Sequence, residues 1–403
     1  MLQALREDCR IELLTWRWVD LEAANRYFGT DLQWNQLRLI PLPRMLRLLD
    51  LLPTPSSLVK SAILLRIARR ITDCYDAVVT VNNEADFGRP GIQYIHYPWN
   101  YRPRPAIDLR WYHSRALLRW YYGAVERISP FEPAGVRRNV TLVNSDWIGA
   151  MVRDLYPGIV TRTLHPPVAG RFAAVPWRER EDGFVVVGRI SPEKRVDLAI
   201  DIVRRLRERG RSLRLHVIGT ADKRAAYRKV KALARENREW LTLHENLPRD
   251  ALCSLLSRQR YGLHAMQEEH FGMAVADMVV AGLIPFVPDG GGQREIVDGV
   301  PEVLWRTPEE AIERIEAVLA DGERQHRILR ALAPRRETLG TDHFVRRVRE
   351  EVAAFLAGSE VQNGPSGRSR LLSRRIDPLE PAHVTAEARS GFQFEPLPRS
   401  ERD

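Results

Sequence analysis

Short apolar runs alternate with amphipathic segments in the second half of the chain. Apolar runs at 183–188, 213–219 and 241–244 predict buried strands. Helical periodicity at 225–236 and 249–258 predicts helices between them. Strands that alternate with helices predict a parallel sheet, with ligands at the carboxyl ends of its strands.

The same alternation continues through residues 261–292. A mostly apolar segment at 261–266 precedes two carboxylates, and a helical run at 273–281 stops at Gly282. A buried strand is predicted at 283–287 and a triple-glycine loop at 290–292. Because unpaired amides at a helix N-terminus favour anions, a phosphate is expected before residue 273.

A helix is predicted to start within residues 189–194, with Ser191 as its cap and Pro192 in its first turn. It is predicted to end at residues 207–210. Two further helices, near 309–319 and 342–356, are expected to finish the fold. Residues 359–403 are rich in Ser, Pro, Arg and Glu without periodicity, which predicts disorder.

The first half has a weaker pattern. Strands are predicted at 9–16, 76–82, 92–97 and 141–145, with Ser145 as the cap of a following helix. Residues 2–6 resemble the end of a helix. An α/β domain normally begins with a strand and a glycine-rich turn, so we expect the native protein to be longer by one such strand and loop.

Length and composition favour two domains. A chain of 403 residues exceeds one ordinary core. The predicted division is a first domain at 1–175, a second domain at 176–345, a closing helix at 346–358 and the tail. The linker is expected within 168–182.

The formal charge of +10 allows nucleic acid, an anionic membrane or an anionic small molecule as partner. The basic residues are spread over the chain without a nucleic-acid motif, which argues against nucleic acid. Residues 36–73 hold seven basic and two acidic side chains. This stretch predicts either a core helix at 57–71 with solvated arginines or a peripheral contact with anionic membrane.

Aromatic and basic residues alternate at 99–138, where packed core is favoured over stacking on bases or sugars. Three distant cysteines form no metal or redox spacing. Neither a signal peptide nor a membrane-spanning run is recognised in the sequence, so the predicted location is cytoplasmic, with peripheral binding to the inner face of a membrane left open.

Three motifs in order carry a family resemblance: GRISPEK at 188–194, EEHFGMAVADMVVAG at 268–282 and GGGQREIVDG at 290–299. Together they resemble the family 4 glycosyltransferases, which have the GT-B fold, an α/β fold of two facing Rossmann-like domains with parallel sheets. The EHFG spelling, with QYIHYP at 93–98, is most similar to the mannosyltransferases that extend dolichol-linked oligosaccharide in α-1,2 linkage.

The resemblance implies a retaining transfer of a hexose, with mannose favoured, to a glycan or lipid-linked acceptor. The implied donor is a nucleoside diphosphate sugar, GDP-mannose or a UDP-sugar, with no cofactor or essential metal. Arg189 and Lys194 would then neutralise the diphosphate, since fixed positive charge lowers the barrier where negative charge grows. His96 would contact the donor sugar from the acceptor side.

The resemblance also assigns the remaining donor contacts. Glu269 would hydrogen-bond sugar hydroxyls, and Asp277 would take the ribose hydroxyls where the family has glutamate. The amides around Phe271, Gly272 and Met273, and the loop at Gly291, would approach the donor. Glu295 would pair with the donor or with Lys194.

Two chemical questions stay open at this stage. Retention by same-face attack, with the leaving phosphate as base, is favoured because no carboxylate near His96 suits a covalent intermediate. The alternative to an active enzyme is a catalytically weakened relative that binds nucleotide sugar without turnover. The shorter Asp277 and the absent first strand favour that alternative.

Overall fold

The computed structural model describes residues 1–16, 19–43, 45–46, 49, 57–81, 83–99, 127–129 and 131–363. Most of the aromatic stretch at 99–138 therefore lies outside the described residues, as does the predicted tail beyond residue 363.

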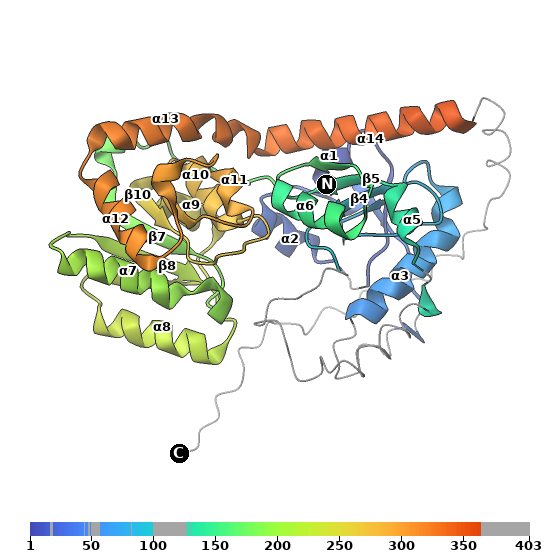
Figure 1. Ribbon diagram of the computed structural model, residues 1–403. Coiled ribbons are helices and arrows are strands. Elements are labelled where there is room, and N and C mark those ends of the chain that lie inside the picture. The colour runs from blue at the N-terminus through green and yellow to red at the C-terminus, as the bar shows by residue number, and fades with distance from the viewer. Residues whose placement is uncertain are drawn as a thin grey trace, which may run out of the picture. The chain divides into compact units, whose positions relative to one another are not determined.

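The second domain is built on one parallel sheet of six strands in the order β12-β11-β10-β7-β8-β9 (Figure 1). Its strands are β7 (Glu181–Val187), β8 (Arg214–Gly219), β9 (Leu241–Glu245), β10 (Gln259–Leu263), β11 (Ile284–Pro288) and β12 (Leu304–Trp305). Its helices are α7 (Val196–Glu208), α8 (Arg224–Glu236), α9 (Arg249–Arg258), α10 (Met273–Ala281), α11 (Gln293–Ile296), α12 (Pro308–Leu319) and α13 (Gly322–Thr338).

Helices cover both faces of this sheet because successive side chains of each strand point to opposite sides. Phe184 and Val186 of β7 pack in a cluster with α7 and α12, whereas Val185 packs in another with α9. All three side chains are buried. This explains why residues 184–187 of β7 are continuously apolar.

The first domain has two separate parallel sheets. One joins β1 (Ile11–Leu13) to β2 (Leu37–Leu39), and the other has the order β3-β4-β5-β6. The strands of the larger sheet are β3 (Val79–Thr80), β4 (Ile92–Ile95), β5 (Val140–Val143) and β6 (Thr161–Thr163). The helices of this domain include α1 (Leu2–Leu5), α2 (Leu21–Phe28), α3 (Ser57–Ile71), α5 (Pro133–Arg137) and α6 (Asp146–Leu155).

The chain returns to the first domain through α14 (Thr341–Asn363), which lies along β4 and β5 in Figure 1. Phe344, Val348 and Val352 of this helix pack with Ile92 and Leu142 of the first sheet. The helix is longer than either expected range, so the predicted disordered tail begins too early, at 359.

Several element predictions are confirmed. The bounds of α3, α9 and α10 agree with the expected ranges. Ser145 caps α6 by accepting a hydrogen bond from the amide of Ile148 at 3.1 Å. Gly282 ends α10 in the left-handed conformation, at φ 83°.

Two expectations about helices were wrong. Residues 192–194 form a 3₁₀ turn, Arg195 is left-handed, and α7 begins only at Val196, where the apolar periodicity starts. Ser191 makes no capping hydrogen bond. Helix α13 was missed because Pro334 lies inside it and normally ends a helix.

Candidate functional site

The strand order places the candidate site. The chain enters the second sheet at β7, builds outward through β8 and β9, and returns to the other side of β7 with β10. Ligands of open parallel sheets bind where the strand order reverses, outside the carboxyl ends of the strands. The loops after β7 and β10, which hold Lys194 and Glu269, meet at this point.

Glu269 is the centre of the arrangement. Its Oε2 pairs with Nζ of Lys194 and lies 3.4 Å from Nε2 of His264, the residue that follows β10. The side chains of Lys194 and Glu269 are 16% and 17% exposed, so this ion pair is largely shielded from water.

The carboxyl of Glu269 is held in its ionised form. Burial acts to raise its pKa, but the adjacent imidazole of His264 and the charge of Lys194 outweigh burial and lower the pKa to about 2. A carboxylate with such a low pKa is a weak base. The group is therefore suited to accepting hydrogen bonds rather than to abstracting a proton.

Gln293 holds the loop that carries Glu269. The buried Gln293 side chain accepts a hydrogen bond from the amide of Glu269 at 3.2 Å and donates to the carbonyl of Gln267 at 2.7 Å. Gly291 packs against the same backbone: a Cβ there would lie 2.7 Å from the carbonyl oxygen of Glu269. With φ +63° as well, position 291 requires glycine. Gly291, which was expected to approach the donor, thus lies against the loop that carries Glu269.

The amino end of α10 follows this loop directly. Gly272, left-handed at φ 109°, is the N-cap, and no side-chain hydrogen bond caps the helix among the described residues. Met273 is 45% exposed, whereas Phe271 is buried and stacks on His165 with ring centroids 5.4 Å apart. These first-turn amides form the expected setting for an anion, beside the ammonium of Lys194.

Asp277 lies deeper in α10 and has a partner that the sequence did not indicate. Its two carboxylate oxygens accept hydrogen bonds from Arg249, at 2.9 and 2.6 Å. Burial raises the pKa of Asp277, and the Arg249 guanidinium opposes that rise. The ribose contact expected for Asp277 stays a prediction, and in this structure its oxygens already have donors.

Arg189 and Lys194 were expected to act together on the diphosphate. In the structure, Arg189 has other partners than Lys194. Its guanidinium donates to Asp222 at 2.7 Å and to Glu193 at 3.4 Å, and its side chain is 58% exposed. Only Lys194 of the two reaches Glu269. A diphosphate contact by Arg189 requires it to leave these surface carboxylates.

His96 directly follows β4 of the first domain. Desolvation, followed by the charge of His270, lowers the pKa of the His96 imidazole. His270 belongs to the Glu269 loop and stacks on Tyr97 with centroids 4.3 Å apart. Ser145 also donates to the carbonyl of His270, at 2.6 Å. The structure thus brings His96 toward the loop that carries Glu269.

Glu295 does not pair with Lys194, one of its two expected partners. Its carboxylate accepts hydrogen bonds from the amides of Asp146 and Trp147, both at 2.8 Å. These amides belong to the first turn of α6, so Glu295 caps a helix of the other domain. The expected pairing with Lys194 is replaced by this contact, and Lys194 pairs with Glu269 instead.

Three contributors were missed from the sequence: His264, Gln293 and Arg249. A buried histidine directly after a strand was a usable signal for His264, because functional side chains gather at strand ends. Gln293 and Arg249 carried no comparable signal.

Within the described part of the chain, no helix is long and apolar enough to cross a membrane. Two arginines of α3, which was considered for a membrane surface, have partners within the chain. Arg66 donates to the carbonyl of Ile128 at 3.0 Å, and Arg69 pairs with the buried Asp86 at 3.4 Å.

Comparison with known proteins confirms the predicted resemblance. The family described as "Glycosyl transferases group 1" matches residues 171–332, which contain the switch point, Lys194, Glu269 and α10. The matched region is thus the second domain.

Curated relatives carry one recurring description, "GDP-Man:Man(3)GlcNAc(2)-PP-Dol alpha-1,2-mannosyltransferase". The chain is similar to the Candida glabrata protein at 24% identity over 234 residues, 51% of this chain and 44% of the relative. It is similar to the Homo sapiens protein at 30% identity over 172 residues, 39% of this chain and 35% of the relative. The chain thus matches about half of these relatives' length or less.

Solved structures confirm the GT-B fold. WaaG, a glycosyltransferase involved in lipopolysaccharide biosynthesis, aligns with a TM-score of 0.56 and 17% identity, over 86% of this chain and 91% of its own. The sucrose-phosphate synthase from Thermosynechococcus elongatus aligns with a TM-score of 0.61 and 14% identity, over 88% and 92%.

Proposed function

We propose, from the premise that residues 171–332 belong to the group 1 glycosyltransferases, that this chain is a retaining hexosyltransferase. The favoured reaction moves mannose from GDP-mannose to a lipid-linked glycan. The curated relatives carry GDP-mannose and a dolichol-linked acceptor in their names, which supports this donor and acceptor class.

One observation carries the proposal: the ammonium of Lys194, the carboxylate of Glu269 and the uncapped amino end of α10 meet at the switch point of the second sheet. A nucleoside diphosphate sugar offers the matching groups. Its diphosphate fits the amides and the ammonium, while its sugar hydroxyls fit the carboxylate.

Lys194 is then the fixed cation on the leaving group. As the glycosidic bond breaks, negative charge grows on the outer phosphate, and a positioned ammonium stabilises that charge without a metal ion. Lys194 exchanges part of its contact with Glu269 for the phosphate. Arg189 joins it on release from Asp222 and Glu193.

Glu269 acts as a hydrogen-bond acceptor for the sugar. Its low pKa, due to His264 and Lys194, makes it a poor general base. The proton of the acceptor hydroxyl therefore goes to the leaving phosphate oxygen. The bond between that oxygen and the anomeric carbon breaks as the acceptor oxygen bonds on the same face, which retains the configuration.

A thermal-shift series tests the donor assignment, because a ligand that binds only the folded state raises its stability. GDP, GDP-mannose, UDP and UDP-glucose are compared at equal concentration. We expect the largest rise in Tm with the guanine nucleotides and no rise with mannose alone. A rise with UDP compounds only would overturn the GDP-mannose assignment.

Turnover is then measured with GDP-mannose and a short polyprenyl-diphosphate glycan. Formation of an α-linked product would establish retention, whereas a β-linked product would overturn the same-face mechanism. Donor binding without any product in the full-length protein would favour the weakened, binding-only relative.

A further inference from the structure

His264 carries a buried nitrogen atom that makes no hydrogen bond. The residue directly follows β10, at the carboxyl edge of the second sheet, and its side chain is 4% exposed. Within the described residues, its Nε2 is buried and has no hydrogen-bond partner. Such a group has lost water without gaining a partner, which is rare in folded proteins and needs an explanation. The candidate site offers one, because Oε2 of Glu269 lies 3.4 Å from this nitrogen.

The backbone of His264 is fixed by the sheet. Its amide donates to the carbonyl of Phe286 on β11 at 2.9 Å, and its chain neighbours Leu263 and Ala265 are buried. The imidazole is therefore anchored behind the candidate site. A shorter contact between Nε2 and the carboxylate has to come from a movement of the Glu269 side chain.

Oε2 of Glu269 lies between two possible donors. Lys194 pairs with this oxygen, and Nε2 of His264 lies near the same atom. The ammonium takes the hydrogen bond in the chain without ligand, since a charged donor binds a carboxylate more strongly than a neutral one. The imidazole is in its Nε2–H tautomer in this arrangement, because an Nε2 lone pair would repel the carboxylate.

The proposed function changes this balance. A bound diphosphate attracts the ammonium of Lys194 away from Glu269. The carboxylate, whose side chain is 17% exposed, would then lose much of its pairing, and a poorly paired charge is costly in a shielded site. His264 is within reach and can donate to Glu269 without competing for the phosphate.

We propose that His264 is a positioning residue for the donor sugar: its Nε2–H takes over Glu269 when Lys194 turns to the diphosphate. This role rests on the proposed function. With Oε2 held by His264, the other carboxylate oxygen is the one presented to the sugar hydroxyls. His264 thus acts through Glu269 and does not touch the substrate.

This exchange of partners distinguishes a nucleotide from a nucleotide sugar. The diphosphate of either ligand draws Lys194 away from Glu269. Only the sugar uses the orientation that His264 gives to the carboxylate. Loss of His264 should therefore weaken the binding of the nucleotide sugar and spare that of the nucleotide.

The second sheet also contains a matched control residue, His216 of β8. Its Nε2 is likewise buried without a hydrogen-bond partner in the part of the chain that the structure describes. Its Nδ1 lies 3.1 Å from Nε2 of His244 on β9, so its neighbour is another imidazole rather than Glu269. His216 lies within its strand, whereas His264 follows the end of one. A buried imidazole can thus be removed from the same sheet outside the candidate site.

The first experiment needs no donor. Lys194→Met removes the ammonium, so Glu269 should turn to His264 in the chain without ligand. Histidine-selective isotope labelling follows the N–H resonances of the ten imidazoles by NMR, and the resonance that is lost in His264→Leu belongs to His264. We expect this resonance at low field in Lys194→Met, as for an N–H bound to a carboxylate, and expect GDP to move it the same way in the native chain. A folded Lys194→Met chain without the low-field resonance would overturn the proposal.

The second experiment measures the affinities for GDP and GDP-mannose by calorimetry. His264→Leu should weaken GDP-mannose binding ~10-fold and leave GDP binding unchanged, because it removes one hydrogen bond to a charged group. His264→Gln retains an N–H donor and should restore most of the loss, and His216→Leu should affect neither ligand. Equal weakening of both ligands, or no rescue by glutamine, would overturn the proposal in favour of a packing role.

The two experiments also separate this role from the proposed function. A rise in Tm with GDP, without any movement of the His264 resonance, would overturn the positioning role and leave the proposed function standing. If no nucleotide raises Tm, the proposed function falls, and Lys194→Met alone decides whether Glu269 exchanges Lys194 for His264.

Discussion

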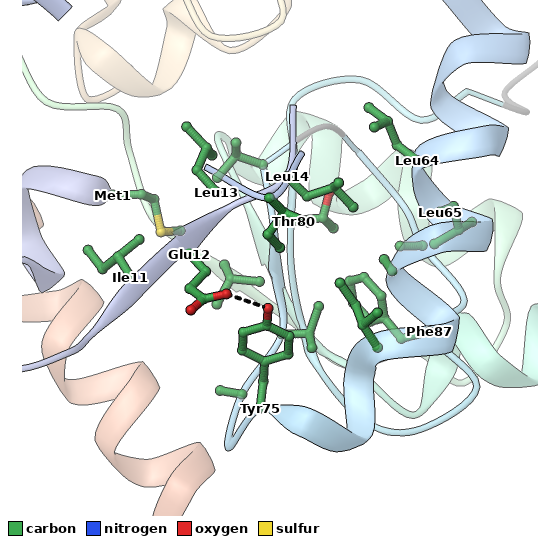
Figure 2. A pocket seen from close by; sticks show the side chains of 18 of the residues that line it. Met1, Ile11, Glu12, Leu13, Leu14, Leu64, Leu65, Tyr75, Thr80 and Phe87 are labelled. Atoms are coloured by element: carbon green, nitrogen blue, oxygen red, sulfur yellow. Dashed lines mark hydrogen bonds between the residues drawn. The ribbon is translucent and has the colours of Figure 1, made fainter. Parts of the chain in front are cut away.

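The two domains differ in how completely their sheets are paired. In the second domain, β7, β8, β10 and β11 each have a neighbour on both sides. Among the described residues of the first domain, β1 and β3 border a cavity (Figure 2) and each pairs with one neighbouring strand. The central strands of the second domain's sheet support the proposed donor site, where Lys194 and Glu269 are positioned by buried strands and by the side chain of Gln293.

We relate this difference to the two parts of the proposed reaction, which are donor binding and transfer to the acceptor. The groups proposed to bind the donor are preorganised, because Lys194 and Glu269 are already in contact without ligand. The proposed acceptor side includes His96, in a domain whose strands form two separate sheets. Binding of a nucleotide sugar is therefore expected to be more robust to change than transfer to an acceptor.

The largest expected effect concerns the second domain. Replacing Asp277 with Asn removes the carboxylate charge that faces the Arg249 guanidinium. The loss of unfolding free energy should be ~3 kcal/mol, at the lower end of the ~3–5 kcal/mol range because Arg249 is 20% exposed. Urea unfolding measures this loss. The double variant Asp277→Leu with Arg249→Met is the control and should recover most of the stability; a double variant as unstable as the single one would contradict this account.

Glu269→Gln should reduce kcat ~10²- to 10³-fold with little loss of GDP affinity, because it removes the charge that the proposed sugar contact needs. Steady-state transfer and calorimetric GDP binding measure the two effects. The exposed neighbour Glu268 is the matched control, and Glu268→Gln should retain activity. Equal losses in both variants would remove Glu269 from its proposed role.

The same carboxylate should show a pH dependence with a defined sign. Its folded pKa, about 2, is below its ordinary value of 4.5, so its stabilising contribution is fully present above pH 4.5. That contribution is lost as the pH falls from about 4.5 toward about 2. The stability difference between the native chain and Glu269→Gln should shrink over this window in urea unfolding, and a constant difference would refute the low pKa.

Glu295→Ala tests the contact between the domains. It removes the acceptor of the Asp146 and Trp147 amides, and loss of a helix cap costs ~0.5–2 kcal/mol. Amide exchange should accelerate in the first turn of α6 and remain unchanged in α10. Glu313→Ala, at an exposed position of α12, is the control and should leave both helices unaffected.

The smallest expected effect lies on the acceptor side. Desolvation lowers the folded pKa of His96 below 6.5, so the unfolded chain binds more protons as the pH falls through that value. Stability should therefore decrease below pH 6.5, and His96→Gln should make that decrease shallower.

Much of the second domain could be predicted because its signals are local. The continuous apolar strands, the run at 273–281 and the stop at Gly282 each depend on neighbouring residues. Phe-Gly before that run likewise marked the helix start at Met273. Helix α13 was the exception, since the local signal of Pro334 is overridden where the helix packs on the domain core through Ile328 and Leu332.

The first domain was harder because its strands are short and its pairing is discontinuous. The predicted strand at 76–82 is only two residues long, at Val79–Thr80.

The amino-acid sequence alone determined the alternation of strands and helices, the helix start before Met273 and the family resemblance, because each is written in adjacent residues. Only the tertiary structure decided that Arg249 holds Asp277, that Glu295 caps α6 and that two strand edges border one cavity. The first two contacts join residues 28 and up to 149 positions apart. The spacing of residues along the chain does not specify such contacts, because they depend on how the helices and strands pack.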